Sequence, residues 1–296
     1  MPPSIPASSS TELAPAHAVP ALVIRRRGTV RAVLARPSGR AGAALLVVTL
    51  ALALVAPLVV SGDPFALSGT PLEAPSRGHP MGTDALGRDL LAGVVHGGRA
   101  SLLIATAVML VAVGCGGAIG LFAGIRGGMA DDVLGRGIEL FQVLPRLFLV
   151  AVVVALFGPG VDRLVLTLGL TSWPAIARVV RGEVIATRGL DFVLASRALG
   201  ASRTHVATRV LLPAVMPSLL VMVGLLFGQV LLTEASLGFL GLGDPTILSW
   251  GVLVGASQGF LRTAWWLTVF PGLAITVAIL AFNLLADALS SVLGGR

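Results

Sequence analysis

Charged residues are scarce in this sequence. Only 12% of its 296 residues are Asp, Glu, Lys or Arg, whereas 55% are hydrophobic. Soluble domains carry about 25% charged residues, so this chain has too few to cover a water-facing surface. The apolar residues also gather in long runs. The composition therefore excludes a soluble globular protein and predicts an integral membrane protein.

Lysine is absent, cysteine occurs once, and several kinds of site are missing with them. The chain has no G-x-x-x-x-G-K-[S/T] loop, so it cannot hold ATP phosphates, and we expect no enzymatic activity and no cofactor. Cys115 is the single cysteine and lies in an apolar run. A disulfide framework within this chain is therefore excluded. His79, Asp84, Asp89 and His96 are close in sequence, but their spacing matches no metal-ligand pattern. We therefore expect neither catalytic residues nor a metal site.

Six uncharged runs reach, or with their flanks approach, the roughly 20 residues that cross a bilayer core. They are Ala41–Val60, Ala100–Ile125, Leu147–Val161, Leu164–Ala177, Val210–Thr233 and Thr263–Ala286. A further uncharged run, Pro245–Leu261, is rich in Gly and Ser; we expect an extracytoplasmic or re-entrant segment there, with a seventh span as the alternative. The predicted fold is all-α and polytopic, with about six transmembrane helices.

The arginines predict the orientation. With a cytoplasmic N-terminus, sixteen of the 21 arginines fall on the cytoplasmic side, as the positive-inside rule requires. Both termini are then cytoplasmic, and the net charge of +7 reflects topology and contact with anionic lipid, without a nucleic-acid partner. We expect a disordered basic tail over 1–40, a first transmembrane helix over 41–61 and an extracytoplasmic loop over 62–98. A core of five helices follows over 99–296, with a cytoplasmic loop over 182–212.

Small residues recur every four positions in the second predicted span. Ala112, Gly116, Gly120 and Gly124 share one helix face. Small side chains let a second helix approach closely in lipid, where packing drives association. The stripe therefore predicts a close helix–helix contact and says little about cargo.

The cytoplasmic loop has the chemistry of a short helix. Asp191 can cap its start, Gly200 can end it, and Ser202 can cap a following helix that runs to Pro213. One face would carry Phe192, Ala195, Ser196 and Leu199, at positions i, i+3, i+4 and i+7. Two interpretations stay open at this point: a helix that docks in a groove of another protein, and an amphipathic helix at the membrane interface.

This loop resembles the coupling loop of permease subunits in ATP-binding-cassette (ABC) importers. The family pattern is E-A-A, three residues, Gly, about nine residues, an apolar pair and Pro. The matching positions are Leu194, Ala195, Ser196, Gly200, Leu211, Leu212 and Pro213. Leu194 replaces the family Glu and Ser196 the second Ala. The resemblance implies that the short helix docks into a cleft of a partner ATPase.

Four further blocks resemble the peptide and nickel branch of that family. They are His79–Asp89 (HPxGTDxxGRD), Trp173–Glu183 (WPxxARxVRGE), Glu234–Gly243 (ExxLSFLGLG, with Gly238 for Ser) and Ala281–Asp287 (AxNLxGD, with Ala286 for Gly). The resemblance implies the transmembrane-domain fold of type I ABC importers in a bacterial inner membrane. It also implies a second, homologous permease subunit, one or two ABC ATPases and an extracytoplasmic substrate-binding protein. This chain would be the second, C-type permease, and its cargo di- or oligopeptides, or a nickel or other chelate.

Four charged residues outside the coupling loop are candidates for contact with cargo or binding protein. Asp84 and Asp89 suit turns and caps, and Arg88 can pair with either carboxylate; we expect a mainly structural role, with binding-protein docking as the alternative. Glu234 begins a Gly-rich run. It would either face a peptide amino terminus, since a carboxylate at membrane depth is costly, or cap the following turn.

Two other classes of membrane protein lack support. An ion-coupled secondary transporter normally carries ionisable residues within its spans, and these runs have none. An intramembrane protease needs a catalytic group there, but all four His residues lie outside the spans.

Overall fold

The structure is a bundle of long helices. The computed structural model describes residues 28–54, 63–143, 145–244 and 246–294. Within that part the chain forms no β-strand, only two isolated bridges near the start of the bundle. The helices are α1 (Thr29–Ala35), α2 (Pro37–Leu54), α4 (Leu90–Arg126), α5 (Gly128–Val143), α6 (Arg146–Phe157), α7 (Val161–Thr187), α8 (Asp191–Ala198), α9 (Arg203–His205), α10 (Leu212–Phe239), α11 (Trp250–Ala256) and α12 (Trp266–Leu293). A π-helical turn, Val206–Leu211, joins α9 to α10.

Five helical segments of the described chain are long and apolar enough to cross a membrane. They are α2, α4, α7, the continuous stretch Arg203–Phe239 and α12. A sixth span results if α5 and α6 are counted together, a pair that bends by 72°. These segments confirm the predicted all-α, polytopic architecture of about six spans.

The third predicted span differs most from expectation. The apolar run Leu147–Val161 corresponds to α6, which has only 12 residues and is too short to cross a bilayer alone. If α5 and α6 together form one crossing, α5 supplies the rest of it, and this helix carries charged residues such as Asp131. Because α5 is less apolar, a search for uncharged runs missed it.

Other boundaries shift where local chemistry extends a helix. Helix α4 begins at Leu90, within the predicted loop 62–98, because the Asp89 side chain caps it. Its 37 residues correspond to about 55 Å at 1.5 Å per residue, more than a bilayer is thick. Residues 29–35 and 37–40, assigned to a disordered tail, are helical. Residues 1–27 of that tail and 55–60 of the first predicted span lie outside the described part.

The stripe of small residues on α4 packs against α7, as its spacing predicts. A Cβ atom added to Gly116 would lie 2.5 Å from the backbone oxygen of Trp173. One added to Gly120 would lie 2.5 Å from the backbone oxygen of Ala177. The two backbones are thus too close for any side chain at these positions.

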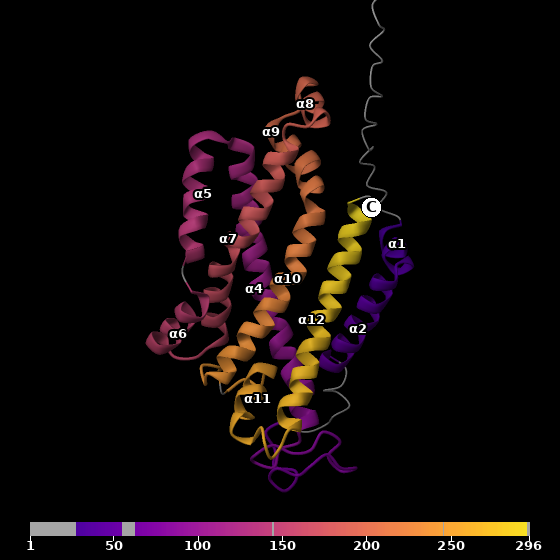
Figure 1. Cartoon of the computed structure of the whole chain (residues 1–296), viewed down its shortest axis with the longest axis vertical. Coiled ribbons are helices and arrows are strands. Elements are labelled where there is room, and N and C mark those ends of the chain that lie inside the picture. The colour runs from indigo at the N-terminus through magenta and orange to yellow at the C-terminus, as the bar shows by residue number, and fades with distance from the viewer. Residues whose placement is uncertain (1–27, 55–62, 144, 245, 295–296) are drawn as a thin grey trace, which may run out of the picture.

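The two ends of the bundle carry different features (Figure 1). Helices α8 and α9 form a tip at one end, toward which the C-terminal end of α12 and helix α1 also point. The loop of residues 63–89 and helix α11 lie at the opposite end. Helix α11 has seven residues, so the run Pro245–Leu261 contains no seventh span within its described residues.

Candidate functional site

Helix α8 ends in a Schellman motif. The N–H of Gly200 donates to the carbonyl of Arg197, and the N–H of Ala201 donates to that of Ser196. Gly200 has a φ of +84°, a conformation that L side chains rarely adopt, so its predicted role as helix terminator is confirmed. The prediction for Asp191 is wrong, because Leu190 is the N-cap residue and no side chain caps this end. Asp191 sits instead in the first turn, where its charge complements the helix dipole.

One apolar residue anchors α8 to the bundle. Val193 is fully buried, and Phe192 packs partly against the same core. The predicted face is therefore divided, since Phe192 and Ser196 are half-buried while Ala195 and Leu199 are exposed. Sequence spacing shows which residues share a helix face, but it does not show which face packs against the bundle. The buried position of Val193 was therefore not predicted.

The opposite side of α8 presents apolar side chains to its surroundings. Leu194 is 48% exposed and Leu199 is 89% exposed, and Leu190 just before the helix is 49% exposed. Exposed leucines at the tip of a helix bundle are typical of a protein interaction site. The position that departs from the family pattern, Leu194, thus contributes to this surface.

The loop leads directly into the membrane-crossing helix α10. The Ser202 hydroxyl accepts a hydrogen bond from the N–H of His205, which confirms Ser202 as a cap. The sequence predicted that this helix runs to Pro213. In the structure it continues past Pro213 to Phe239. A π-helical turn precedes Pro213, with the N–H of Leu212 bonded to the carbonyl of Ala207. This wider turn tolerates a proline, which has no N–H to donate, so α9 and α10 form one continuous helix.

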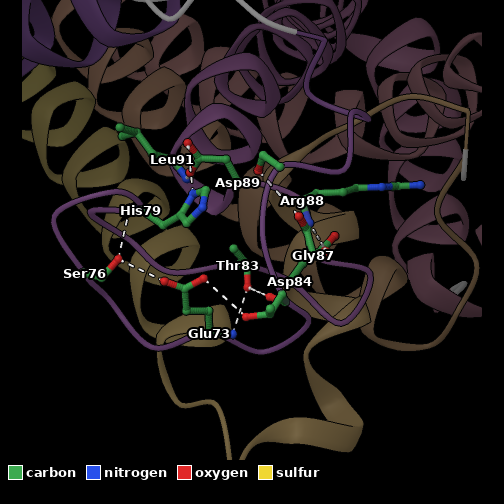
Figure 2. A network of polar contacts seen from close by, with 11 residues as sticks. Glu73, Ser76, His79, Thr83, Asp84, Gly87, Arg88, Asp89 and Leu91 are labelled. Atoms are coloured by element: carbon green, nitrogen blue, oxygen red, sulfur yellow. Dashed lines mark hydrogen bonds and ion pairs between the residues drawn. The ribbon is translucent and has the colours of Figure 1, made fainter.

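At the other end, the loop of residues 63–89 is organised around Thr83. Its hydroxyl donates to the carbonyl of Thr70 (2.6 Å) and accepts from the N–H of Glu73 (2.8 Å). Figure 2 shows Glu73 also reached by the Ser76 hydroxyl, at 3.2 Å. The indole N–H of Trp266, in α12, donates to the carbonyl of Thr83. The loop is therefore a hydrogen-bonded cap fastened to the bundle.

The charged candidates in this cap hold turns (Figure 2). The Asp84 carboxylate accepts hydrogen bonds from the N–H groups of Leu86 and Arg88, each at 2.8 Å. Asp89 accepts from the N–H of Leu91, which caps α4. The Arg88 guanidinium lies over the ring of Phe65, 5.2 Å from its centroid. The expected ion pair of Arg88 with Asp84 or Asp89 is not among the contacts of the described residues.

Asp89 also lies beside a histidine. Its carboxylate lies 3.9 Å from Nδ1 of His79. A second close contact, between Arg181 and Asp131, is an ion pair that joins α7 to α5. No group of three or more His, Cys, Asp or Glu side chains in that part could hold a metal ion.

Glu234 is buried, and it joins three segments. Its carboxylate accepts a hydrogen bond from the Ser101 hydroxyl of α4 at 2.9 Å, and Ser249 and the backbone of Gly251 lie beside it. The same Ser101 oxygen accepts from the N–H of Trp250 at 3.0 Å. Glu234 lies inside α10, so the predicted capping of the next turn is wrong.

The space beside Glu234 is small. The adjoining cavity measures about 20 Å³, room for roughly one water molecule. In this conformation the carboxylate therefore meets protein hydroxyls and backbone and has no space for a peptide. Ser101 and Trp250 were missed by sequence reasoning, because neither carries a motif and Ser101 lies 133 residues from Glu234 and 149 from Trp250.

Comparisons with known proteins agree on one family. The family model described as "Binding-protein-dependent transport system inner membrane component" matches residues 116–296. A relative from Brucella suis bears the provisional name of a peptide transport system permease protein. It is 35% identical to this chain over 90% of this chain's length and 91% of the relative's length. The di/tripeptide transport system permease protein DppC of Pseudomonas aeruginosa is 37% identical over 72% of this chain and 71% of its own.

One solved structure shares the fold. A chain of the MetNI methionine ABC transporter, in an inward-facing conformation, superposes with a TM-score of 0.58. The match covers 68% of this chain and 96% of that one, at 17% sequence identity. That similarity supports the architecture of an ABC importer transmembrane domain.

Proposed function

This chain belongs to the family of binding-protein-dependent transport system inner membrane components, and we propose that it forms half of a pathway importing di- or oligopeptides. As a family member it is the permease subunit of an ABC importer. The peptide cargo is supported by relatives named for peptide and di/tripeptide transport. ATP hydrolysis takes place on a separate subunit.

One observation carries the proposed mechanism: a short helix, anchored to the bundle by Val193, projects exposed leucines from one tip. Leu194 and Leu199 insert into a cleft of the ATPase, while buried Val193 transmits the force to the bundle. The Schellman motif at Gly200 and the cap at Ser202 keep the loop stiff. Movement of the ATPase pair then shifts α8 without bending it.

The continuous helix from Arg203 to Phe239 connects the two ends. A displacement of α8 acts on the start of this helix, and Glu234 near its far end is bonded to Ser101 of α4, which also bonds the start of α11. A tilt of this helix therefore couples the ATPase to the opposite end of the pathway. ATP binding favours one of two arrangements by binding it more tightly.

The assembly requires partners on both faces. We propose a homologous second permease subunit, one or two ABC ATPases at the α8 end and a substrate-binding protein at the loop of residues 63–89. The α8 end and both termini face the cytoplasm, in agreement with the arginine distribution. Asp84 and Asp89 shape the surface on which the binding protein docks.

Purification of the tagged chain from its native membrane in mild detergent, followed by mass spectrometry, tests this function. We expect a related six-helix permease and one or two ATPases to co-purify. A bound extracytoplasmic protein would then identify the cargo by the peptide it retains. Recovery of the chain alone or as a homo-oligomer at every detergent strength would contradict the proposal.

A further inference from the structure

Four arginines line one cavity at the α8 end of the molecule. The cavity measures about 560 Å³, and its arginines are Arg126, Arg188, Arg197 and Arg203. They come from four places: the last residue of α4, the residue after α7, the last turn of α8 and the first residue of α9. The other lining residues are glycine or apolar, so within the described part of the chain no carboxylate lines this cavity.

Helix-end chemistry explains two of these arginines. Arg188 donates from Nη1 to the carbonyl of Gly124 at 2.7 Å, which satisfies an open carbonyl at the end of α4. Arg126 ends the same helix, where a cation complements the dipole. Its guanidinium lies over the ring of Phe122, 5.2 Å from the centroid.

Arg203 does not fit that explanation. It occupies the first position of a helical stretch that continues to Phe239, and a cation at a helix N-terminus is unfavourable. None of the four arginines takes part in the Arg181–Asp131 ion pair or in the His79–Asp89 contact. The cavity thus gathers four positive charges beside the positive end of a long helix, and the nearby carboxylate of Asp131, which acts on Arg188, is already paired with Arg181.

From this arrangement we infer that the cavity is a binding site for a phosphate-bearing anion. Guanidinium groups match phosphate oxygens in paired, charge-assisted hydrogen bonds. The bound anion links Arg197 and Arg203 of the proposed coupling loop to Arg126 and Arg188 at the ends of the bundle helices. Its occupancy would therefore stiffen the joint through which α8 moves the bundle.

The phosphate can belong to an anionic lipid headgroup or to a soluble anion. Both sources are tested on the full chain in phospholipid nanodiscs. Inorganic pyrophosphate is titrated calorimetrically into nanodiscs of neutral phosphatidylcholine. Retention of phosphatidylglycerol from mixed nanodiscs is counted by native mass spectrometry.

The test variant is Arg126→Gln with Arg203→Gln, both exposed positions. The control is Arg136→Gln with Arg209→Gln, also exposed, outside the cavity and equal in charge change. We expect the test variant to weaken binding of pyrophosphate or phosphatidylglycerol about tenfold or more, and the control to leave it nearly unchanged. The probe that binds the unaltered chain identifies the source.

Two results would overturn the inference. One is that neither pyrophosphate nor phosphatidylglycerol binds the unaltered chain. The other is that both double variants lose affinity equally, which would indicate diffuse charge attraction. Circular dichroism and size-exclusion chromatography show whether each variant is folded.

Discussion

The carboxylate of Glu234 in α10 accepts a hydrogen bond from the hydroxyl of Ser101 in α4, at 2.9 Å and in a buried setting. The same hydroxyl accepts from the backbone N–H of Trp250. One serine and one glutamate thus join two long helices to the segment that closes one end of the bundle. Glu234 was selected from the sequence as a contact for cargo, but its neighbours give it a structural task.

Loss of this carboxylate should loosen the far end of the bundle. Glu234→Ala leaves the buried Ser101 hydroxyl without its acceptor, at an expected cost of about 1–3 kcal/mol in stability. Thermal unfolding in detergent should detect it. Ser236→Ala is the control, because that hydroxyl is exposed and bonds only within its own helix. Equal melting temperatures for the two variants would show that the network contributes nothing.

Gly120→Ala should disrupt the contact between α4 and α7. The added Cβ would meet the backbone oxygen of Ala177 at 2.5 Å, so the helices must separate, at about 1–3 kcal/mol. Gly117→Ala lies on the same helix with open space around it. That control should be neutral or slightly stabilising, because Ala favours helix. Thermal stability and yield of the folded chain compare the two, and tolerance of both substitutions would contradict the packing described.

Gly200→Val should uncouple ATP hydrolysis from transport. No atom lies within 4 Å of the added Cβ, so the substitution acts through the backbone φ of +84°. A non-glycine residue there costs about 1–2 kcal/mol, enough to open the Schellman motif. In reconstituted vesicles we expect hydrolysis to persist while peptide uptake falls. Ala198→Val, exposed in the same helix, should retain uptake; full uptake by Gly200→Val would remove the role of this turn.

Asp84→Ala should weaken assembly or docking of the binding protein before it changes which cargo is preferred. Its carboxylate holds a turn through two backbone N–H groups, worth about 1 kcal/mol each. Asp63→Ala provides the match, because Asp63 accepts one such bond in an exposed turn. Pull-down with the binding protein and competition among peptides separate the two effects. An altered preference in a fully assembled complex would assign Asp84 to cargo recognition.

The features that sequence predicted best depend on local chemistry. Apolar runs mark membrane spans because lipid requires them, and Gly200 and Ser202 mark helix ends through their own backbone and side-chain preferences. The close contact made by the small-residue stripe of α4 was predicted from the four-residue spacing alone, which is also a local feature.

The features that were missed depend on tertiary contacts. Helix α5 packs against α7 despite its charges, because Asp131 pairs with Arg181 of α7. The buried side of α8 could not be chosen before its docking against the bundle was known. Ser101 and Glu234 are separated by 133 residues, and no local pattern connects them.

Site-directed cross-linking tests the central claim that α8 docks on the ATPase. Cys115→Ala removes the single cysteine, and Leu199→Cys then places a thiol at the most exposed leucine of the coupling loop. Leu86→Cys, exposed in the loop at the opposite end, is the matched control. We predict that Leu199→Cys cross-links to an ATPase subunit in native membranes and that Leu86→Cys does not. Cross-linking of the ATPase from Leu86→Cys and not from Leu199→Cys would contradict the account.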